Sequence, residues 1–237
     1  MASKPNKATS AVAKAAQQYS EQTALRAAIQ LIPYVGGAID TLVTGKATQI
    51  QMQRIEYFLH ELRARLERVE MIKANVDDDA FMDLMLTTFE KVSRARSADK
   101  QSRFANIVSR QVVEAQSWED AEMAVRLVSE LEDIHIEVAN TALSAPPCDK
   151  AFEGLQVVTL TPSSNQDRDL AGNSPLLLSD ALPHYSSAAL RMACAELMAK
   201  GLLHDEGVSR WDMGAMQYFV ATDLARWLQE WLLNSNQ

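Results

Sequence analysis

The strongest constraint on how this chain can fold is a run of apolar residues at alternating intervals of three and four. The run extends over residues 52–69, and charged side chains of both signs occupy the positions between them. This spacing places the apolar side chains on one face of an α-helix, as in helices that pack lengthwise on a partner. The sequence therefore predicts a long helix whose packing seam consists of Met52, Ile55, Leu59, Leu62, Leu66 and Val69.

Three further helices are predicted before the proline pair Pro146-Pro147. The first opens near Asn75, where the run Asp77-Asp78-Asp79 supplies an acidic first turn that favours a helix start. The second starts around Ser97. The third is expected to run without a break from Ser117 to the prolines, which a helix interior does not tolerate. The first half of the chain is therefore predicted to be a helical bundle that contains a coiled-coil hairpin.

Beyond the prolines the pattern changes from helical to mixed. A short β-type run at Gln156–Leu160 is followed by a polar loop at residues 161–174. A helix capped by Ser186 and stopped by Gly201 comes next, and two short strands around a turn lead to a last helix capped by Thr222. Helix, strand, wing, strand and helix in this order predict a winged-helix-like ending.

The predicted fold class is therefore mainly α, with a small antiparallel β-wing in a C-terminal α+β domain. We expect a flexible basic tail at residues 1–22 and a helical bundle with an apolar Gly/Pro hairpin at 23–116. The winged-helix-like domain is expected to cover 117–237, and within it Pro175–Leu182 is predicted to form a short apolar helix.

The predicted hairpin is built around an uncharged run of 13 residues, Ala27–Ile39. This run is too short to span a membrane, which takes about 20 apolar residues. Two interpretations remain open: the segment packs on the helix at 52–69, or it leaves the bundle and inserts into an anionic membrane surface. The residues that form this candidate membrane or partner segment are Leu25, Ile29, Leu31, Ile32, Pro33, Tyr34, Val35, Gly36, Gly37 and Ile39.

The sequence contains no recognisable catalytic motif. It has no Gly-x-Ser-x-Gly and no phosphate-binding loop, and Cys148 and Cys194 have no metal-ligand spacing. The pair Glu132-x-x-His135 matches half of a di-metal carboxylate site, but no second copy occurs. His135 is therefore expected to be a core or interface histidine, and the chain is expected to be a non-enzyme without metal or cofactor.

Charge argues against bulk attraction to nucleic acid, because 31 acidic and 23 basic residues give a net charge of −8. The concentrated basic stretch is Lys91–Arg110, with six basic residues and one acid. On the predicted recognition helix, Ala188, Arg191, Ala195 and Ala199 form one line and Ala189, Met192, Glu196 and Lys200 the next. A winged helix used for packing or protein contacts is favoured; the candidate nucleic-acid contacts of the alternative are Arg191, Lys200 and Arg210.

Two resemblances bear on function. The phrase Leu197–Leu203, followed by Tyr218–Thr222, resembles the recognition-helix and wing pattern of many winged-helix domains. More broadly, Phe58–Glu67, Arg103–Val108, the helix through Leu127 and Leu131, and the Gly201–Thr222 ending resemble the abortive-infection alpha family of bacterial phage-defence proteins. The resemblance implies a role in phage defence and brings no catalytic residues with it.

From these observations we expect a non-enzymatic, abortive-infection-like defence effector or interaction protein. Its expected partner is another protein or a second copy in a homo-oligomer, with the membrane surface as a further candidate through residues 25–43 and nucleic acid less favoured. The expected location is the cytoplasm, with the inner-membrane periphery as the alternative for a membrane-active form. The competing interpretation is a winged-helix DNA-binding transcriptional regulator.

Overall fold

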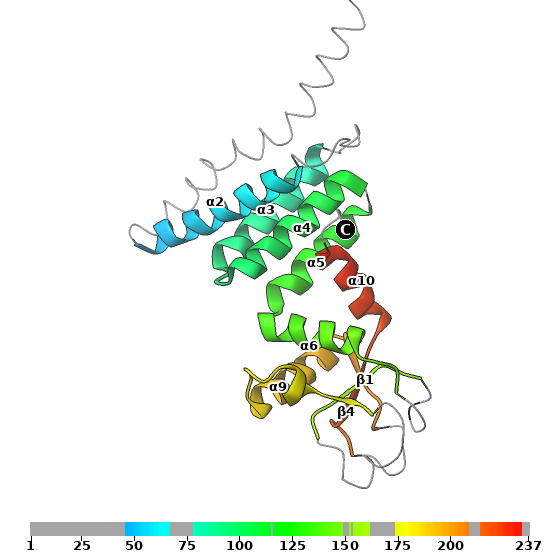
Figure 1. Ribbon diagram of the computed structural model, residues 1–237. Helices are drawn as coiled ribbons and strands as arrows, with labels where there is room; N and C mark the ends of the chain where they lie inside the picture. Colours follow the sequence, from blue (N-terminus) through cyan, green and yellow to red (C-terminus); the bar gives the residue numbers. More distant parts are fainter. Residues whose placement is uncertain are drawn as a thin grey trace, which may run out of the picture. The chain divides into compact units, whose positions relative to one another are not determined.

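A computed structural model describes residues 46–66, 78–114, 116–148, 152, 154–161, 174–208 and 214–233. They form a mainly helical protein with a small four-stranded mixed sheet (Figure 1). The chain divides into two compact units between Glu130 and Leu131, whereas the sequence prediction placed the boundary one helix earlier, between residues 116 and 117. The apolar segment at 25–43 and the predicted contact Arg210 lie outside the described residues.

The first unit is built from helices α2 to α5. Helix α2 packs along both α3 and α4, and α5 completes the layer against α3 and α4. Aromatic rings anchor the contact of α2 with α3, because Phe58 and Phe89 meet edge to face with their ring centroids 5.9 Å apart. The bounds are α2 Lys46–Leu66, α3 Asp78–Arg94, α4 Ala98–Glu114 and α5 Trp118–Glu130.

The predicted seam of α2 corresponds only in part to its buried face. Ile55, Leu62 and Leu66 are buried, but Met52 and Leu59 are half-buried, and Val69 lies outside the described residues. Phe58, which is fully buried and was not included in the seam, takes the central position. Because α2 packs on both α3 and α4 and not on a single helix, its buried face is rotated away from the seam expected for a simple coiled coil.

A polar cluster joins α2 to α4 beside this apolar contact. The guanidinium of Arg65 donates three hydrogen bonds. Nε donates to Asn106 Oδ1, Nη2 donates to Ser102 Oγ at 2.7 Å, and Nη1 donates to Glu61 Oε2. The Arg65–Glu61 bond measures 2.8 Å, and Ser102 in turn donates to the same carboxylate oxygen at 3.4 Å. A planar guanidinium group can donate several hydrogen bonds at once in a fixed geometry, so the cluster fixes the register of the two helices.

Replacing Arg65 by Ala should lower the free energy of unfolding by about 2–3 kcal/mol, because Asn106 and Glu61 would lose their charged partner in a partly buried setting. Urea denaturation followed by circular dichroism measures the effect. The matched control is Arg94→Ala, since Arg94 is 72% exposed and pairs with the exposed Glu90 on its own helix. It should change stability by less than about 0.5 kcal/mol, and equal effects of the two substitutions would contradict a stabilising role for the cluster.

The second unit packs three of its helices against a four-stranded sheet whose strand order is β2-β1-β4-β3. Strand β4 is antiparallel to both β1 and β3, and β2 adds to β1 in parallel. In register, Val158 lies opposite Phe219, and both side chains are buried. The bounds are α6 Asp133–Ser144, β1 Val157–Thr159, β2 Leu176–Leu177, α8 Leu178–Ala181, α9 Ser187–Ala199, β3 Leu203–Asp205, β4 Tyr218–Ala221 and α10 Asp223–Leu232.

Two predicted helices of this region are wrong in part. The single helix expected from Ser117 to the prolines is broken at Leu131–Glu132 into α5 and α6. The predicted helix Pro175–Leu182 is a two-residue strand followed by one helical turn, because Leu176 and Leu177 pair with β1. The caps of the last two helices are confirmed: Ser186 Oγ accepts from Ala189 N at 3.2 Å, and Thr222 Oγ1 accepts from Ala225 N at 3.3 Å.

One buried carboxylate holds both sides of the loop between β3 and β4. Asp205 Oδ1 accepts from Gly207 N at 3.0 Å and Oδ2 accepts from Met216 N at 2.6 Å. Met216 has a φ of 61°, a conformation that costs free energy for a residue other than glycine. A Cβ atom at Gly207 would lie 2.6 Å from the carbonyl oxygen of Gly214, so the two sides approach too closely for any other residue.

Replacing Asp205 by Ala should open this loop, because two backbone N–H groups would lose a charged acceptor and Met216 would lose the bond that offsets its backbone conformation. The expected loss is about 2 kcal/mol. Hydrogen exchange should quicken in peptides that cover residues 205–217 and stay unchanged over α2 to α4. The control is His204→Ala, at the exposed neighbouring position of the same strand. Unchanged exchange in Asp205→Ala would show that the loop keeps its shape without the carboxylate.

Candidate interaction surface

Helix α9 presents an exposed, partly apolar side in the second unit. Its inner side is formed by Leu190, Ala193, Cys194 and Leu197, which are buried against α6, α8 and β3. Gly201, with a φ of 73°, ends the helix in a left-handed conformation that favours glycine. The buried side chains and the glycine at the end of the helix fix the position of α9, and its opposite side is exposed to solvent.

The outward side of α9 is apolar along its centre and charged along its two edges. The centre is a line of four residues, Ala188, Met192, Ala195 and Ala199, which we call the α9 stripe; Ala195 is half-buried and the other three are exposed. Met192 is 64% exposed, which is high for a large apolar side chain in a folded protein. The exposed Arg191 and Glu196 flank the stripe, one on each side.

His135 of α6 fixes the position of Glu196. Its Nδ1 accepts a hydrogen bond from the backbone N–H of Glu132 at 2.9 Å, so Nδ1 carries no proton in this geometry. The proton is therefore on Nε2, which lies 2.9 Å from Glu196 Oε2 and donates to it. The buried histidine caps the start of α6 and orients a carboxylate at the edge of the α9 stripe.

A second carboxylate of α6 ties down the segment that precedes α9. Glu137 accepts from Tyr185 OH at 2.9 Å through Oε1, and its Oε2 lies 3.0 Å from His184 Nε2. The rings of His184 and Tyr185 lie beside each other with centroids 4.1 Å apart. These contacts link α6 to the turn that leads into α9, so the start of α9 is held in place by side chains as well as by its cap.

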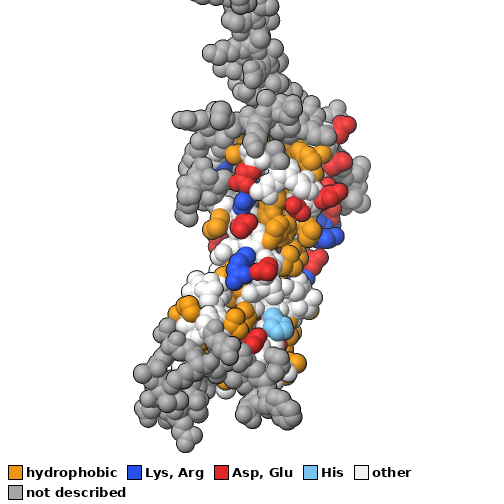
Figure 2. Space-filling model, turned by 90° about the vertical axis from the view of Figure 1, so that its right-hand side faces the viewer, with side chains coloured by type: hydrophobic (Ala, Val, Ile, Leu, Met, Phe, Trp, Pro, Cys, Tyr) orange, Lys and Arg blue, Asp and Glu red, His pale blue; other side chains and the backbone are white. Residues whose placement is uncertain are grey.

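The net charge of the second unit disfavours binding to the phosphate backbone of a nucleic acid. Residues 131–233 contain 14 acidic and 6 basic residues, which accounts for the whole net charge of −8 of the chain. The face drawn in Figure 2 includes parts of both units, and on it the blue Lys and Arg side chains form small separate patches with red acidic side chains close by. A carboxylate oriented at the edge of α9 adds to the repulsion that a phosphate would meet there.

Two of the three predicted nucleic-acid contacts belong to α9 or its C-terminal cap. Arg191 is exposed at the edge of the α9 stripe, and Lys200 is half-buried at the C-terminal end of α9. Arg210 lies outside the described residues. The basic stretch Lys91–Arg110 belongs to the first unit, where Arg94 pairs with Glu90, Arg110 pairs with Glu114 and Lys100 is buried.

Within the described residues, no group of three or more His, Cys, Asp and Glu side chains has the arrangement of a metal site. Glu132 and His135, the pair that matches half of a di-metal motif, instead make the backbone cap described above. Over the same residues, no helix is long and apolar enough to cross a membrane.

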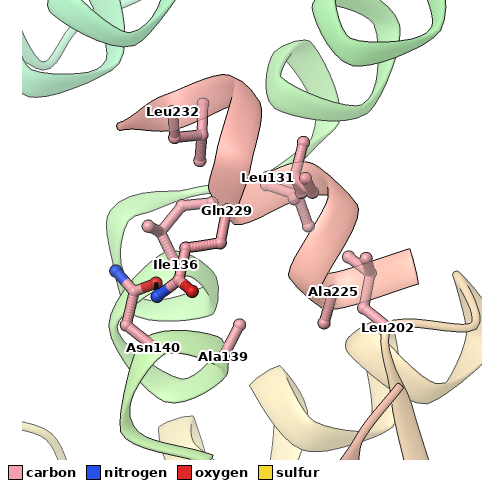
Figure 3. A pocket seen from close by; sticks show the side chains of 9 residues that line it. Leu131, Ile136, Ala139, Asn140, Leu202, Ala225, Gln229 and Leu232 are labelled. Atoms are coloured by element: carbon pink, nitrogen blue, oxygen red, sulfur yellow. Dashed lines mark hydrogen bonds between the residues drawn. The ribbon is translucent and has the colours of Figure 1, made fainter. Parts of the chain in front are cut away.

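A shallow hollow between α6 and α10 is too small for a ligand. It is lined mainly by Leu131, Ile136, Leu202 and Leu228, and Gln229 Nε2 donates to Asn140 Oδ1 at 3.2 Å across its rim (Figure 3). Its enclosed space of about 10 Å³ is close to the room needed by a single water molecule. The hollow is therefore a packing imperfection between two helices rather than a binding site.

The cysteine of α9 lies on its buried side. Burial raises the pKa of the Cys194 thiol from 9.0 to about 12, although the nearby Arg191 charge acts in the opposite direction. The thiol is therefore protonated at neutral pH. Since the thiolate is the reactive form, Cys194 is unsuited to nucleophilic or redox chemistry.

Cys194 should accordingly react with a thiol reagent such as 5,5′-dithiobis(2-nitrobenzoic acid) at pH 8 at least about tenfold more slowly in the native chain than in denaturant. A Cys148→Ser variant isolates its signal, since Cys148 is the only other cysteine. Labelling of native Cys194 as fast as that of the unfolded chain would mean that α9 does not stay packed on the sheet.

Most of this surface was not identified as a site from the sequence. The predicted site residues included Arg191 and Lys200, but not Met192, Ala195 or Glu196. The available signal was the spacing of Ala188, Met192, Ala195 and Ala199, which places them on one face opposite the buried leucines. Comparison with models of known protein families, with curated proteins and with solved structures finds no match to this chain.

Proposed function

We propose that the chain is a non-enzymatic interaction protein of bacterial phage defence, and that residues 131–233 form a winged-helix domain that contacts another protein through the α9 stripe. The observation that carries the proposal is the exposed apolar centre of α9, with Met192 at 64% exposure, on a helix whose ends are firmly held. Exposed apolar surface with polar edges is typical of protein contact sites.

The winged-helix assignment is supported by element order and pairing. Helix α6 comes first, then β1, the two-residue β2 and the turn of α8, helix α9, β3 and β4 around the Asp205 loop, and finally α10. Strand β1 pairs with β4, and β4 with β3, both antiparallel. In this arrangement α9 occupies the place of the recognition helix, and the β3–β4 loop that of the wing. The first unit is proposed to be a helical bundle that serves as the scaffold.

The charge and shape of α9 support a protein partner over DNA. Recognition helices read bases through Arg, Lys, Asn and Gln side chains, whereas the centre of this helix offers three alanines and a methionine. Winged-helix domains serve many functions, so the fold by itself does not imply DNA binding. The role in phage defence rests on the resemblance to the abortive-infection alpha family.

A charged residue in the α9 stripe should abolish protection. Cells that express Met192→Asp are expected to lose phage resistance to the level of an empty vector, because a carboxylate buried in a protein interface is strongly unfavourable. Leu86→Asp is the matched control: Leu86 is a similarly exposed apolar residue, 46% exposed on α3, and its substitution should leave resistance intact. Plating efficiency over a panel of phages measures the effect.

Two results would contradict this proposal. Full resistance in Met192→Asp would remove the α9 stripe from the function. Salt-sensitive binding of duplex DNA by the purified chain, weakened by Arg191→Ala and unaffected by Met192→Asp, would support the transcriptional regulator instead. Fluorescence anisotropy with a labelled duplex distinguishes these cases.

A further inference from the structure

We infer that the protein that occupies the α9 stripe is a second copy of this chain, with the two α9 helices side by side and parallel. The inference rests on the proposed function only in that α9 is the contact surface. What it adds is the identity and orientation of the partner, which follow from the order of apolar and charged residues along the exposed face.

The α9 stripe has the spacing of a short two-stranded helix contact. Ala188, Met192, Ala195 and Ala199 follow one another at intervals of four, three and four residues. These intervals correspond to successive d, a, d and a positions of a heptad repeat. The buried Leu190, Ala193, Cys194 and Leu197 fall at the f, b, c and f positions on the far side, so packing within the domain leaves the heptad seam open.

Small side chains on this seam allow the helix axes to come close. The separation of packed helices is set by the side chains at the contact, over a range of about 8–10 Å. Three alanines place this pair near the lower limit, and the single large residue, Met192, supplies a flexible side chain that adapts to its neighbour. The stripes of two copies can therefore pack on each other without a pocket to receive a large side chain.

The charged edges select the parallel orientation. Arg191 takes the g position and Glu196 the e position five residues later, on opposite edges of the seam. A two-fold axis parallel to the helices brings Arg191 of each copy next to Glu196 of the other, so the dimer contains two such opposite-charge pairs. An antiparallel pair would place Arg191 of one copy next to Arg191 of the other, and these two like charges repel each other. Charges at these two positions are known to set helix partner and orientation.

Glu196 is already positioned for this contact. Its Oε2 accepts from His135 Nε2 at 2.9 Å, while its side chain remains 48% exposed. The carboxylate can therefore keep the His135 bond and accept from an arginine through Oε1. Because the side chain is held in advance, little conformational entropy is lost when the second copy binds.

The contact is small, so the association is expected to be weak. Helix α9 has 13 residues, which is less than two full heptads. Interfaces below about 1,200 Å² are typical of transient complexes. A concentration-dependent equilibrium between monomer and dimer is therefore expected, and not a permanent dimer.

A charge exchange between two variants tests the pairing. Arg191→Glu alone and Glu196→Arg alone should each weaken self-association about tenfold, since both cross-pairs become repulsive. An equimolar mixture of the two should associate about as well as the unmodified chain, because each heterodimer regains two opposite-charge pairs. Sedimentation velocity over a range of concentrations measures this, and Arg226→Glu on α10 is the matched control at an exposed arginine.

Cysteine cross-linking provides a second measurement that does not disturb Glu196. Met192→Cys should form a disulfide between two copies under mild oxidation, because equal positions face each other in a parallel pair. A mixture of Ala188→Cys and Ala199→Cys should yield no mixed cross-link, since those positions meet only in an antiparallel pair. Each variant is made in the Cys148→Ser background, and the buried Cys194 thiol, with its raised pKa, stays unreactive.

The outcomes separate this inference from the proposed function. If the chain sediments as a monomer at every concentration and Met192→Cys gives no cross-link, the second copy is not the partner, even where Met192→Asp abolishes resistance. The occupant is then a helix of a different protein. A mixed Ala188–Ala199 cross-link overturns the parallel orientation. If resistance survives Met192→Asp, the proposed function fails whether or not the copies associate.

Discussion

The second unit depends on one buried imidazole. His135 uses its two ring nitrogens in opposite roles, as acceptor for the Glu132 N–H and as donor to Glu196. The first bond sets where α6 begins, and the second connects α6 to α9. Because a neutral ring has one donor and one acceptor, the two partners can be satisfied together in a single tautomer. The position of a carboxylate at the exposed edge of α9 is thus determined by its contact with a buried ring.

The first unit uses polar contacts in the same manner. Arg65 reaches from α2 to Ser102 and Asn106 on α4, and Arg54 NH1 donates to the carbonyl of Ser93 at 2.8 Å near the end of α3. A cation at this position also interacts favourably with the helix dipole of α3. Apolar burial brings the helices of this unit together, and these directional bonds determine how far each one slides along its neighbour.

The sequence predicted best those features that are encoded locally. The caps Ser186 and Thr222 and the stop at Gly201 each depend on one residue and its nearest neighbours. The break between α5 and α6 was missed because its cap is a histidine side chain three residues ahead, which is not among the usual capping residues. The burial of Phe58 was not predicted, because α2 packs on two helices and its buried face is therefore rotated from the predicted seam. The α9 stripe was visible as spacing, yet its exposure depends on how α6, α8 and β3 cover the other side.

The Asp205 carboxylate separates the β3–β4 loop from the rest of the sheet. Its two bonds, to Gly207 N and Met216 N, close the base of the loop before the chain reaches residues 209–213. The register of β3 and β4, in which Leu203 lies opposite Ala221 and Asp205 opposite Phe219, is thus supported directly at the base of the loop. A change at Asp205, Gly207 or Met216 would therefore affect both strands at once, because these residues close the base of the loop that joins them.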